Sequence, residues 1–304
     1  MASQLASLLQ PYGKVLGLLL MMVLGIAFPQ ISSLSFLIQY LLMAMLFFAF
    51  LDIEIQPRSF ESGVLWVVLA NILIAFAAYW IILPYDFNLA LTAFITGSAP
   101  TATAAPVIIG FLQGQVEYVV GAVLISNVTM SLLLPVALPF VVGDVVEVSI
   151  WQVLKPVLVT MFIPLALARL SRLLPEKTQS AIRQGKAFSF PFWLLALLIS
   201  SAKASDFLRN DVSASATAVL PIALVSLALC ILNFSVGSLL GGERFRQESS
   251  QSLGQKNNAF VIWVALTFIN PLVAMGPTFY ILYHNLYNSW QIYRFERRRG
   301  KNSR

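Results

Sequence analysis

Long apolar stretches, each long enough to cross a lipid bilayer as a helix, recur along the whole chain. A membrane-spanning helix needs roughly 20 largely apolar residues, with a range of about 17 to 25. The stretches are continuous rather than alternating, so they predict helices and not the strands of a barrel. We therefore expect an all-α membrane protein of about ten transmembrane helices. The expected spans are residues 15–29, 34–51, 64–83, 87–112, 116–142, 150–168, 188–202, 214–240, 249–269 and 271–292.

The composition indicates the same class of protein. Only 11% of the 304 residues are charged and 59% are apolar, whereas a soluble domain carries roughly 25% charged residues. With one cysteine, Cys230, and one histidine, His284, the sequence offers neither an intrachain disulfide nor a multi-histidine metal site. We expect no catalytic residue, no metal and no cofactor.

The basic residues predict the orientation in the membrane. If the chain crosses ten times with both termini in the cytoplasm, fifteen of the nineteen lysines and arginines face the cytoplasm. Lys155, Lys203 and Arg209 face the other side, and Lys256 lies inside a span. This asymmetry follows the positive-inside rule. Because six basic residues lie within residues 294–304, the positive charge indicates a tail beside anionic lipid rather than nucleic-acid binding. We expect a multi-pass protein of the cell (inner) membrane.

Two charged turns near the middle of the chain mark a boundary between halves. Residues 171–185 follow the sixth expected span and residues 143–147 follow the fifth. We place the boundary at residues 143–147, so that residues 1–142 and 143–304 each contain five spans. Because five is odd, two similar halves must lie inverted in the membrane.

Two expected spans contain sequences that an uninterrupted helix cannot accommodate. The fourth contains Gly97, Pro100 and Pro106 among small residues, and each proline removes a backbone donor and clashes with the preceding turn. The ninth contains the polar cluster of residues 252–258. The two breaks, centred near Thr103 and Lys256, lie about half the chain length apart.

Interrupted helices in a membrane protein indicate a buried cavity or binding site. Irregular backbone at membrane depth is tolerated where it is buried in protein or lines a cavity. Interrupted segments in matching positions of two halves point to the binding site of a transporter. The free amides at the start of a half-helix favour an anion. A kinked fourth helix and a loop before a short ninth helix are the alternatives, but the matched positions favour two crossing broken helices.

At these residues the chain resembles the bile acid:sodium symporter family. The family's fourth helix carries a small-residue crossover, which residues 101–105 resemble, followed by a short helix and a glycine turn like residues 107–115. Its fifth helix carries serine and threonine, as Ser126-Asn127-Val128-Thr129 does, and its ninth carries a Gly-x-Gln-Asn crossover similar to residues 254–258. The resemblance covers most of the chain in layout and rests chiefly on the two breaks.

The resemblance implies a fold and a mode of action. Ten helices would form two inverted repeats, with a core domain of spans 3–5 and 8–10 that contains the crossing broken helices 4 and 9. Spans 1, 2, 6 and 7 would form a panel domain. An organic anion would be carried by alternating access as the core rocks against the panel. Bile acids, sulfated steroids, keto acids and pantoate-like compounds are within the family's range.

The residues that hold sodium in the family differ in this sequence. The family's carboxylate before the ninth-helix crossover aligns with Ser252, and the crossover glutamine aligns with Lys256. The Ser-Asn pair of the family's fourth helix aligns with Ala105-Pro106. Because an ammonium repels a sodium ion, sodium coupling through the usual sites is not expected.

Lys256 is the central residue of the expected site. A lysine at mid-membrane costs roughly 2.5–3.5 kcal/mol on insertion scales, so a partner is expected. We hypothesise that its ammonium replaces a sodium ion and holds Asn257, Asn258 and the carbonyls of residues 101–103 together. The alternatives are direct pairing with a substrate carboxylate, exchange of a proton because burial favours the neutral amine, and a snorkelling position at a helix end. The expected substrate and ion site comprises Lys256, Asn257, Asn258, Gln255, Ser252, Thr101, Thr103, Pro100, Pro106, Asn127, Thr129 and Asn71.

These observations predict a secondary transporter of a small organic anion, with protons as a candidate coupling ion. An auxin-efflux-type carrier or a cation/proton antiporter of the same fold is the alternative, although antiporters rely on acidic residues and none lies at either break. An intramembrane enzyme is the alternative from another class. It needs paired aspartates or several metal ligands, which the spans do not offer. Substrate, direction and oligomeric state do not follow from the sequence.

Overall fold

The computed structural model describes residues 13–51, 59, 61–143, 149–210, 217 and 219–302. Within these ranges the regular elements are helices, joined at one point by a single antiparallel bridge. In chain order they are α2 (Gly13–Ala27), η2 (Pro29–Leu34), α3 (Leu37–Leu51), α4 (Ser62–Ile82), α5 (Phe87–Ser98), α6 (Ala105–Phe111), α7 (Val116–Val142), α8 (Ile150–Leu170), η5 (Ser171–Leu173), α9 (Glu176–Gln184), η6 (Gly185–Phe188), α10 (Ser189–Asn210), α11 (Val219–Leu240), α12 (Arg246–Gly254), α13 (Asn258–Phe268) and α14 (Pro271–Asn302).

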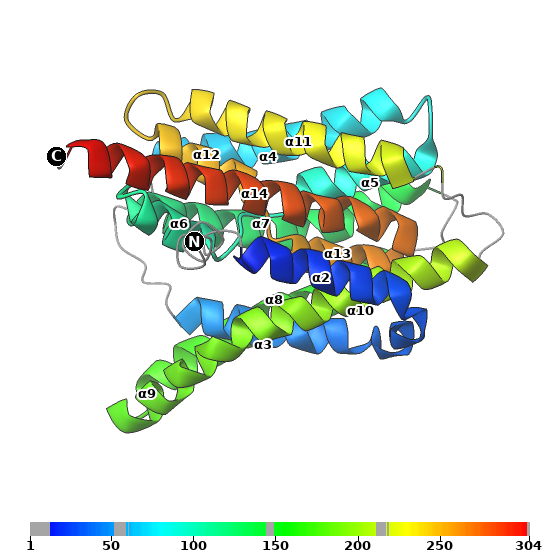
Figure 1. Ribbon diagram of the computed structural model, residues 1–304. Coiled ribbons are helices and arrows are strands. Elements are labelled where there is room, and N and C mark those ends of the chain that lie inside the picture. The colour runs from blue at the N-terminus through cyan, green and yellow to red at the C-terminus, as the bar shows by residue number, and fades with distance from the viewer. Residues whose placement is uncertain are drawn as a thin grey trace, which may run out of the picture.

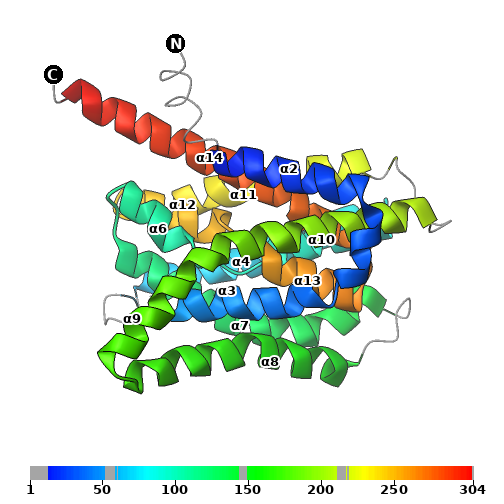
Figure 2. The same ribbon diagram turned by 60° about the horizontal axis from the view of Figure 1, so that its bottom comes forward.

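The helices form two groups, one in the lower and one in the upper part of Figure 1, and the lower group comes forward in Figure 2. Helices α2, α3, α8 and α10 pack on one another, and they occupy the lower part of Figure 1. Helices α4, α5, α11, α12 and α14 pack together in the upper part, with α7 against α4 and α6. Helix α13 contacts members of both groups.

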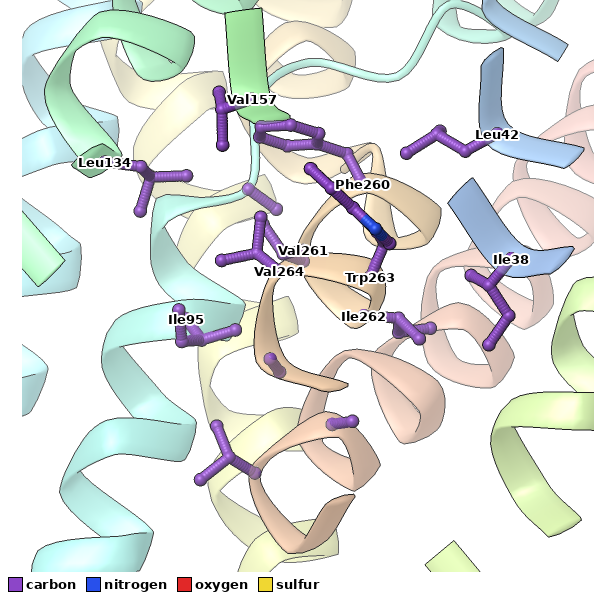
Figure 3. Close-up of a cluster of buried hydrophobic side chains, with 14 of the residues drawn as sticks. Ile38, Leu42, Ile95, Leu134, Val157, Phe260, Val261, Ile262, Trp263 and Val264 are labelled. Atoms are coloured by element: carbon purple, nitrogen blue, oxygen red, sulfur yellow. The ribbon is translucent and has the colours of Figure 1, made fainter. Parts of the chain in front are cut away.

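Helix α13 lies in the centre of the apolar core. Its side chains point to several sides at once (Figure 3), toward Ile38 and Leu42 of α3, Ile95 of α5 and Val157 of α8. Phe260 is fully buried, as are most of its neighbours in this helix. A helix that is apolar on all sides can be covered on all sides, so α13 packs against both groups, which also contact each other directly through α7 with α8 and α10 with α14.

Length and composition identify α13 and its neighbours as helices of a membrane protein. Five helical segments in the described ranges are long and apolar enough to cross a bilayer. Shorter apolar helices, including α5 and α13, accompany them. The chain is thus an all-α, multi-pass membrane protein. The five long segments are Ser62–Ile82, Val116–Val142, Ile150–Leu173, Glu176–Asn210 and Val219–Leu240.

The prediction that the fourth and ninth spans are interrupted is confirmed. Helix α5 ends at Ser98 and α6 begins at Ala105, while α12 ends at Gly254 and α13 begins at Asn258. Ala99 has an extended conformation, with φ −56° and ψ 131°, because the residue before a proline is disfavoured in the helical region. Pro106 lies in the first turn of α6, where the missing amide hydrogen needs no intrahelical partner.

Three expected boundaries were wrong. The seventh span does not end at residue 202, because α10 continues to Asn210 and includes Lys203. There the Ser205 hydroxyl and the Arg209 guanidinium donate to the Ile26 carbonyl oxygen, at 3.0 and 2.9 Å, so polar groups on this last turn have partners. The loop expected at residues 171–185 contains α9, and the helix of the last expected span, α14, continues beyond residue 292 to Asn302.

Some expectations lie outside the described residues. The proposed repeat boundary falls largely on residues 144–148, which the structure does not describe, although Gly143 ends α7 with a φ of +61°. The expected start of the eighth span, residues 214–216, also lies outside the described ranges, as do Arg58, Arg304 and the side chains of residues 298–302.

Candidate functional site

The two interrupted helices cross at their breaks. Thr101 and Lys256 form an antiparallel bridge. The Ala102 amide donates to the Gln255 carbonyl oxygen at 2.8 Å, and the Asn257 amide donates to the Pro100 carbonyl oxygen at 2.7 Å. Each break therefore satisfies backbone groups that the other break has freed, which an apolar interior requires.

Side chains of neighbouring helices hold Thr101 in this crossing. Its hydroxyl donates to the Ser252 carbonyl oxygen at 2.6 Å, and its amide donates to the Ser126 hydroxyl at 3.0 Å. The Asn127 side chain of α7 donates to the Thr101 carbonyl oxygen at 2.9 Å and to the Val123 carbonyl oxygen at 2.7 Å. Helix α7 thus contacts the crossing through Ser126 and Asn127, which belong to the polar segment noted in the fifth expected span.

Lys256 is 2% exposed and lies within the crossing. Its ammonium donates to the Asn71 side-chain oxygen of α4 and to the Gly97 carbonyl oxygen of α5, the latter at 3.1 Å. The Asn71 amide group in turn donates to the Ala99 carbonyl oxygen at 3.2 Å. Among the residues that the structure describes, Lys256 is the only buried lysine or arginine.

Gly97 allows these oxygens to converge. A Cβ atom at Gly97 would lie 2.9 Å from the Cα atom of Ala75, which is closer than real Cβ contacts. The glycine therefore lets α5 approach the backbone of α4, and Asn71 lies one turn before Ala75 on the same helix. The Gly97 carbonyl and the Asn71 side chain come together at the Lys256 ammonium because of this close approach.

The expected partners of the ammonium were wrong, although Asn71 was correctly placed near the crossing. Asn257, Asn258 and the carbonyls of residues 101–103 do not bind the Lys256 ammonium; they bind other groups, and the ammonium contacts Asn71 and Gly97. The snorkelling alternative is also wrong, since the side chain is buried. The backbone bridge with Thr101 fixes the direction of the Lys256 side chain. This bridge is a tertiary contact, so the sequence around Lys256 does not reveal it.

The other residues of the second break have separate contacts. The Asn257 side chain caps α13 by accepting from the Phe260 amide at 3.4 Å and approaches Asn127 at 3.5 Å. Asn258 donates to the Lys256 carbonyl oxygen at 3.2 Å and lies 3.5 Å from the His284 ring nitrogen. Within the described residues, the Ser252 hydroxyl and the Gln255 side-chain oxygen are buried without a hydrogen-bond partner.

Three expected site residues lie farther from this network. Thr103 is half-buried in the turn before α6, Pro106 lies within the first turn of that helix, and Thr129 is half-buried on α7. In the described part of the chain, no hydrogen bond joins the Thr103 or Thr129 side chains to the second break. Pro106 shapes the start of α6 and does not contribute a polar group.

Sequence analysis missed two contributors to the crossing. The Tyr280 hydroxyl of α14 donates to the Gly254 carbonyl oxygen at 2.7 Å, so it satisfies the end of α12. No sequence signal distinguishes this tyrosine from the other aromatic residues of its span. Ser126 could have been identified, because it precedes Asn127 directly and both side chains bind Thr101.

The arrangement combines one positive charge, neutral oxygens and two helix starts in a buried place. Helices α6 and α13 both begin beside the crossing, and the start of a helix carries partial positive charge. The groups on Lys256 are an amide oxygen and a carbonyl oxygen, which are also the kind of oxygens that replace the hydration shell of a metal cation in membrane sites. In this structure these oxygens bind the ammonium of a lysine side chain.

The comparisons with known proteins identify the family of the chain. The model of the Sodium Bile acid symporter family matches residues 27–239, which include the first break and end before the second. A search of curated proteins gave no match to the chain. The family match covers more than half of the chain, and its members are membrane transporters rather than enzymes, with a small-molecule substrate. The chain belongs to the sodium bile acid symporter family.

Proposed function

We propose that the chain moves a small organic anion across the membrane by alternating access, without sodium at the family's usual sites. The Lys256 ammonium takes the place of the cation at the crossing. The observation that carries this proposal is the burial of Lys256, with its ammonium bound by Asn71 and Gly97. A fixed ammonium there would exclude a second cation by repulsion.

The chemistry of the partners supports the role of the ammonium. Both are neutral oxygens from different helices, α4 and α5, so the charge links these helices to α12 and α13 through the backbone of the crossing. A bound ion in the same place would make the same link. A lysine ammonium links these helices throughout the transport cycle, unless the amine releases its proton during the cycle.

The preference for an anion rests on the same region. Helices α6 and α13 begin at the crossing, and the partial positive charge at the start of a helix favours an anion. Lys256 adds a full positive charge. The buried Ser252 hydroxyl, which has no partner among the described residues, adds a donor that a substrate could use.

The proposed movement is the rocking of two domains, each assembled from both halves of the chain. Spans 3–5 and 8–10 form the core domain, spans 1, 2, 6 and 7 form the panel domain, and residues 1–142 and 143–304 form inverted repeats. In support, α2, α3, α8 and α10 pack together, and α5–α6 and α12–α13 have matching positions in the two halves.

We further propose that both termini lie in the cytoplasm of the cell (inner) membrane. In support, the basic helix α9, the start of α12 and the end of α14 are found at the same end of the bundle (Figure 1). This end contains Lys177, Arg183, Arg246 and Arg294, as the positive-inside rule requires of the cytoplasmic side.

Uptake into liposomes tests the proposal. The full chain is reconstituted and supplied with a panel of labelled organic acids under separate sodium and proton gradients. We expect uptake of an organic anion that does not respond to the sodium gradient. In Lys256→Ala, the Asn71 and Gly97 oxygens lose the ammonium that joins them to the crossing, so we expect uptake to fall at least about tenfold.

A matched variant controls for the loss of a positive charge. Lys155 is exposed on α8, and Lys155→Ala should transport like the unchanged protein. The proton gradient separates a fixed ammonium from one that cycles, because only a cycling amine makes uptake respond to that gradient. Sodium-dependent uptake that survives unchanged in Lys256→Ala would refute the replacement of the ion by Lys256.

A further inference from the structure

A groove between α11 and α14 lies apart from the crossing and takes no part in it. Its volume is about 270 Å³, and its lining includes Leu227, Ile231, Phe234, Leu286 and Tyr287. Ile231 is 59% exposed and Leu286 45%, whereas Phe234 in the floor is buried. The groove is therefore open on the outer face of the bundle, which faces lipid in a membrane protein.

The two helices that line the groove run toward exposed arginines at the end of the bundle where α14 ends (Figure 1). On α11, Ser235 lines the groove, and one turn later the Ser238 hydroxyl accepts from Arg246 Nε at 3.0 Å. On α14, Arg294 lies over the ring of Trp290 at 5.2 Å. Both helices thus lead from the apolar groove to a guanidinium group.

Stacked rings connect the groove with the second arginine. The rings of Phe234 and Tyr287, which both line the groove, lie 4.3 Å apart, and those of Tyr287 and Trp290 lie 5.7 Å apart. Trp290 is 45% exposed. Tryptophan is enriched at the level of the lipid headgroups, so the arginine beyond it lies at headgroup depth and the groove lies deeper.

The end of the groove near Arg246 and Arg294, called the rim below, stays positively charged because two nearby acids have other partners. Glu61 forms an ion pair with Arg244 at 3.4 Å, and the buried Glu248 carboxylate accepts from the Gln115 amide at 2.7 Å. The exposed Glu243 is the other described acid in this turn. Arg246 and Arg294 each have several N–H donors in a planar group that suits the oxygens of a phosphate.

We propose that the groove and its rim bind an anionic phospholipid. One acyl chain lies in the apolar groove between α11 and α14, and the phosphate lies between Arg246 and Arg294. Basic pockets between transmembrane helices on the cytoplasmic side bind acidic lipid headgroups in this way. The inference is independent of how Lys256 works, and it can fail without affecting the proposed transport.

Lipid retention tests the headgroup site. The full chain in detergent is titrated with an equal mixture of phosphatidylglycerol and phosphatidylcholine, and bound lipids are counted by native mass spectrometry. We expect the chain to retain phosphatidylglycerol preferentially. Each arginine near the surface contributes about 1 kcal/mol, so Arg246→Gln/Arg294→Gln should weaken phosphatidylglycerol binding about thirtyfold. The control Lys177→Gln/Arg183→Gln removes two exposed charges from α9 at the same end and should have no effect.

A second pair of variants tests the groove. Ser235→Phe fills the groove from its exposed side and should lower the retention of phosphatidylglycerol. Leu239→Phe adds a ring on α11 outside the groove, at a side chain that is 77% exposed, and should change nothing. Unchanged retention in the arginine double variant or in Ser235→Phe would overturn the proposal. Complete displacement by inorganic phosphate would also overturn it, because the acyl chain would then add nothing.

Discussion

The two helix breaks that cross in this protein consist of different types of residue. The first, residues 99–104, consists of small residues and contains Pro100, which prevents α5 from continuing. The second, residues 255–257, contains no proline and consists of polar residues. The Asn257 side chain caps α13, and the Lys256 ammonium bonds with two other helices.

This difference separates a break made locally from one made by tertiary contacts. Pro100 disfavours helical backbone at Ala99, so the first break has a local cause, although prolines inside α7, α8 and α14 leave those helices continuous. The second depends on Asn71, Gly97 and the Tyr280 hydroxyl, which all lie on other helices. Substitutions around the second break should therefore have larger effects than substitutions in the first, and variants at Asn71, Lys256, Gly254 and Pro100 test this order.

The largest effect is expected at Asn71. In Asn71→Leu the buried ammonium loses a partner, and a hydrogen bond to a charged group contributes about 1.5–3 kcal/mol. We expect the free energy of unfolding in mixed micelles to fall by that amount. Lys256→Met should cost less, about 1–2 kcal/mol, because it leaves neutral acceptors unpaired rather than a charge.

The double variant Asn71→Leu/Lys256→Met sharpens this result. Replacing both partners by apolar groups of similar shape removes the charge together with its partner. We expect the double variant to be more stable than Asn71→Leu alone, with a coupling of about 1 kcal/mol or more in the double-mutant cycle. Additive losses would mean that the two side chains do not depend on each other.

A smaller effect is expected at Gly254, the last residue of α12. A Cβ atom there would overlap the ring of Phe234 on α11. Overpacking of this kind costs about 1–3 kcal/mol, so Gly254→Ala should lower the unfolding temperature measured in detergent. Gly17→Ala is the control, since the nearest atom to its Cβ would be 4.0 Å away. A melting temperature equal to that of the unchanged chain would show that the ring moves freely.

The smallest effect is expected in the first break. Pro100→Ala keeps the carbonyl that accepts from the Asn257 amide, and it changes mainly the freedom of the unfolded chain, by about 0.4–1 kcal/mol. Unfolding in mixed micelles should show this small loss, and uptake should stay within about threefold of the unchanged protein. A loss as large as that of Asn71→Leu would reverse the comparison between the two breaks.

The sequence carried enough local information to predict both interruptions. Two prolines and Gly97 in an apolar span, and a polar cluster around Lys256 in another, mark positions where a helix ends. The side chains of Ser126, Asn127 and Asn71 bind backbone groups of the first break. Polar side chains on neighbouring helices are expected beside an interrupted helix, because its free backbone groups need partners. The apolar spans also predicted an all-α membrane protein, since every such stretch must form internal hydrogen bonds.

The partners of Lys256 could not be predicted in the same way. A lysine side chain is long, and its direction depends on which residue pairs with its backbone, here Thr101. The role of Gly97 depends on how closely α5 approaches α4, and that of Tyr280 on the rotation of α14. The end of α10 was not predicted because the Ser205 and Arg209 side chains donate to a carbonyl oxygen on α2. No local sequence pattern indicates this tertiary contact.

Helix α14 has 32 residues and continues without interruption into the basic end of the chain. At 1.5 Å per residue it is about 48 Å long. Its first turns pack against helices of the crossing, so in a rigid rotation about its start its far end would move the farthest. A rotation of only about 10° would displace its far end by roughly 8 Å. A fluorophore on Asn302 would therefore magnify motions too small to detect at Lys256, and single-molecule recordings of one carrier could follow its cycle from outside the bilayer.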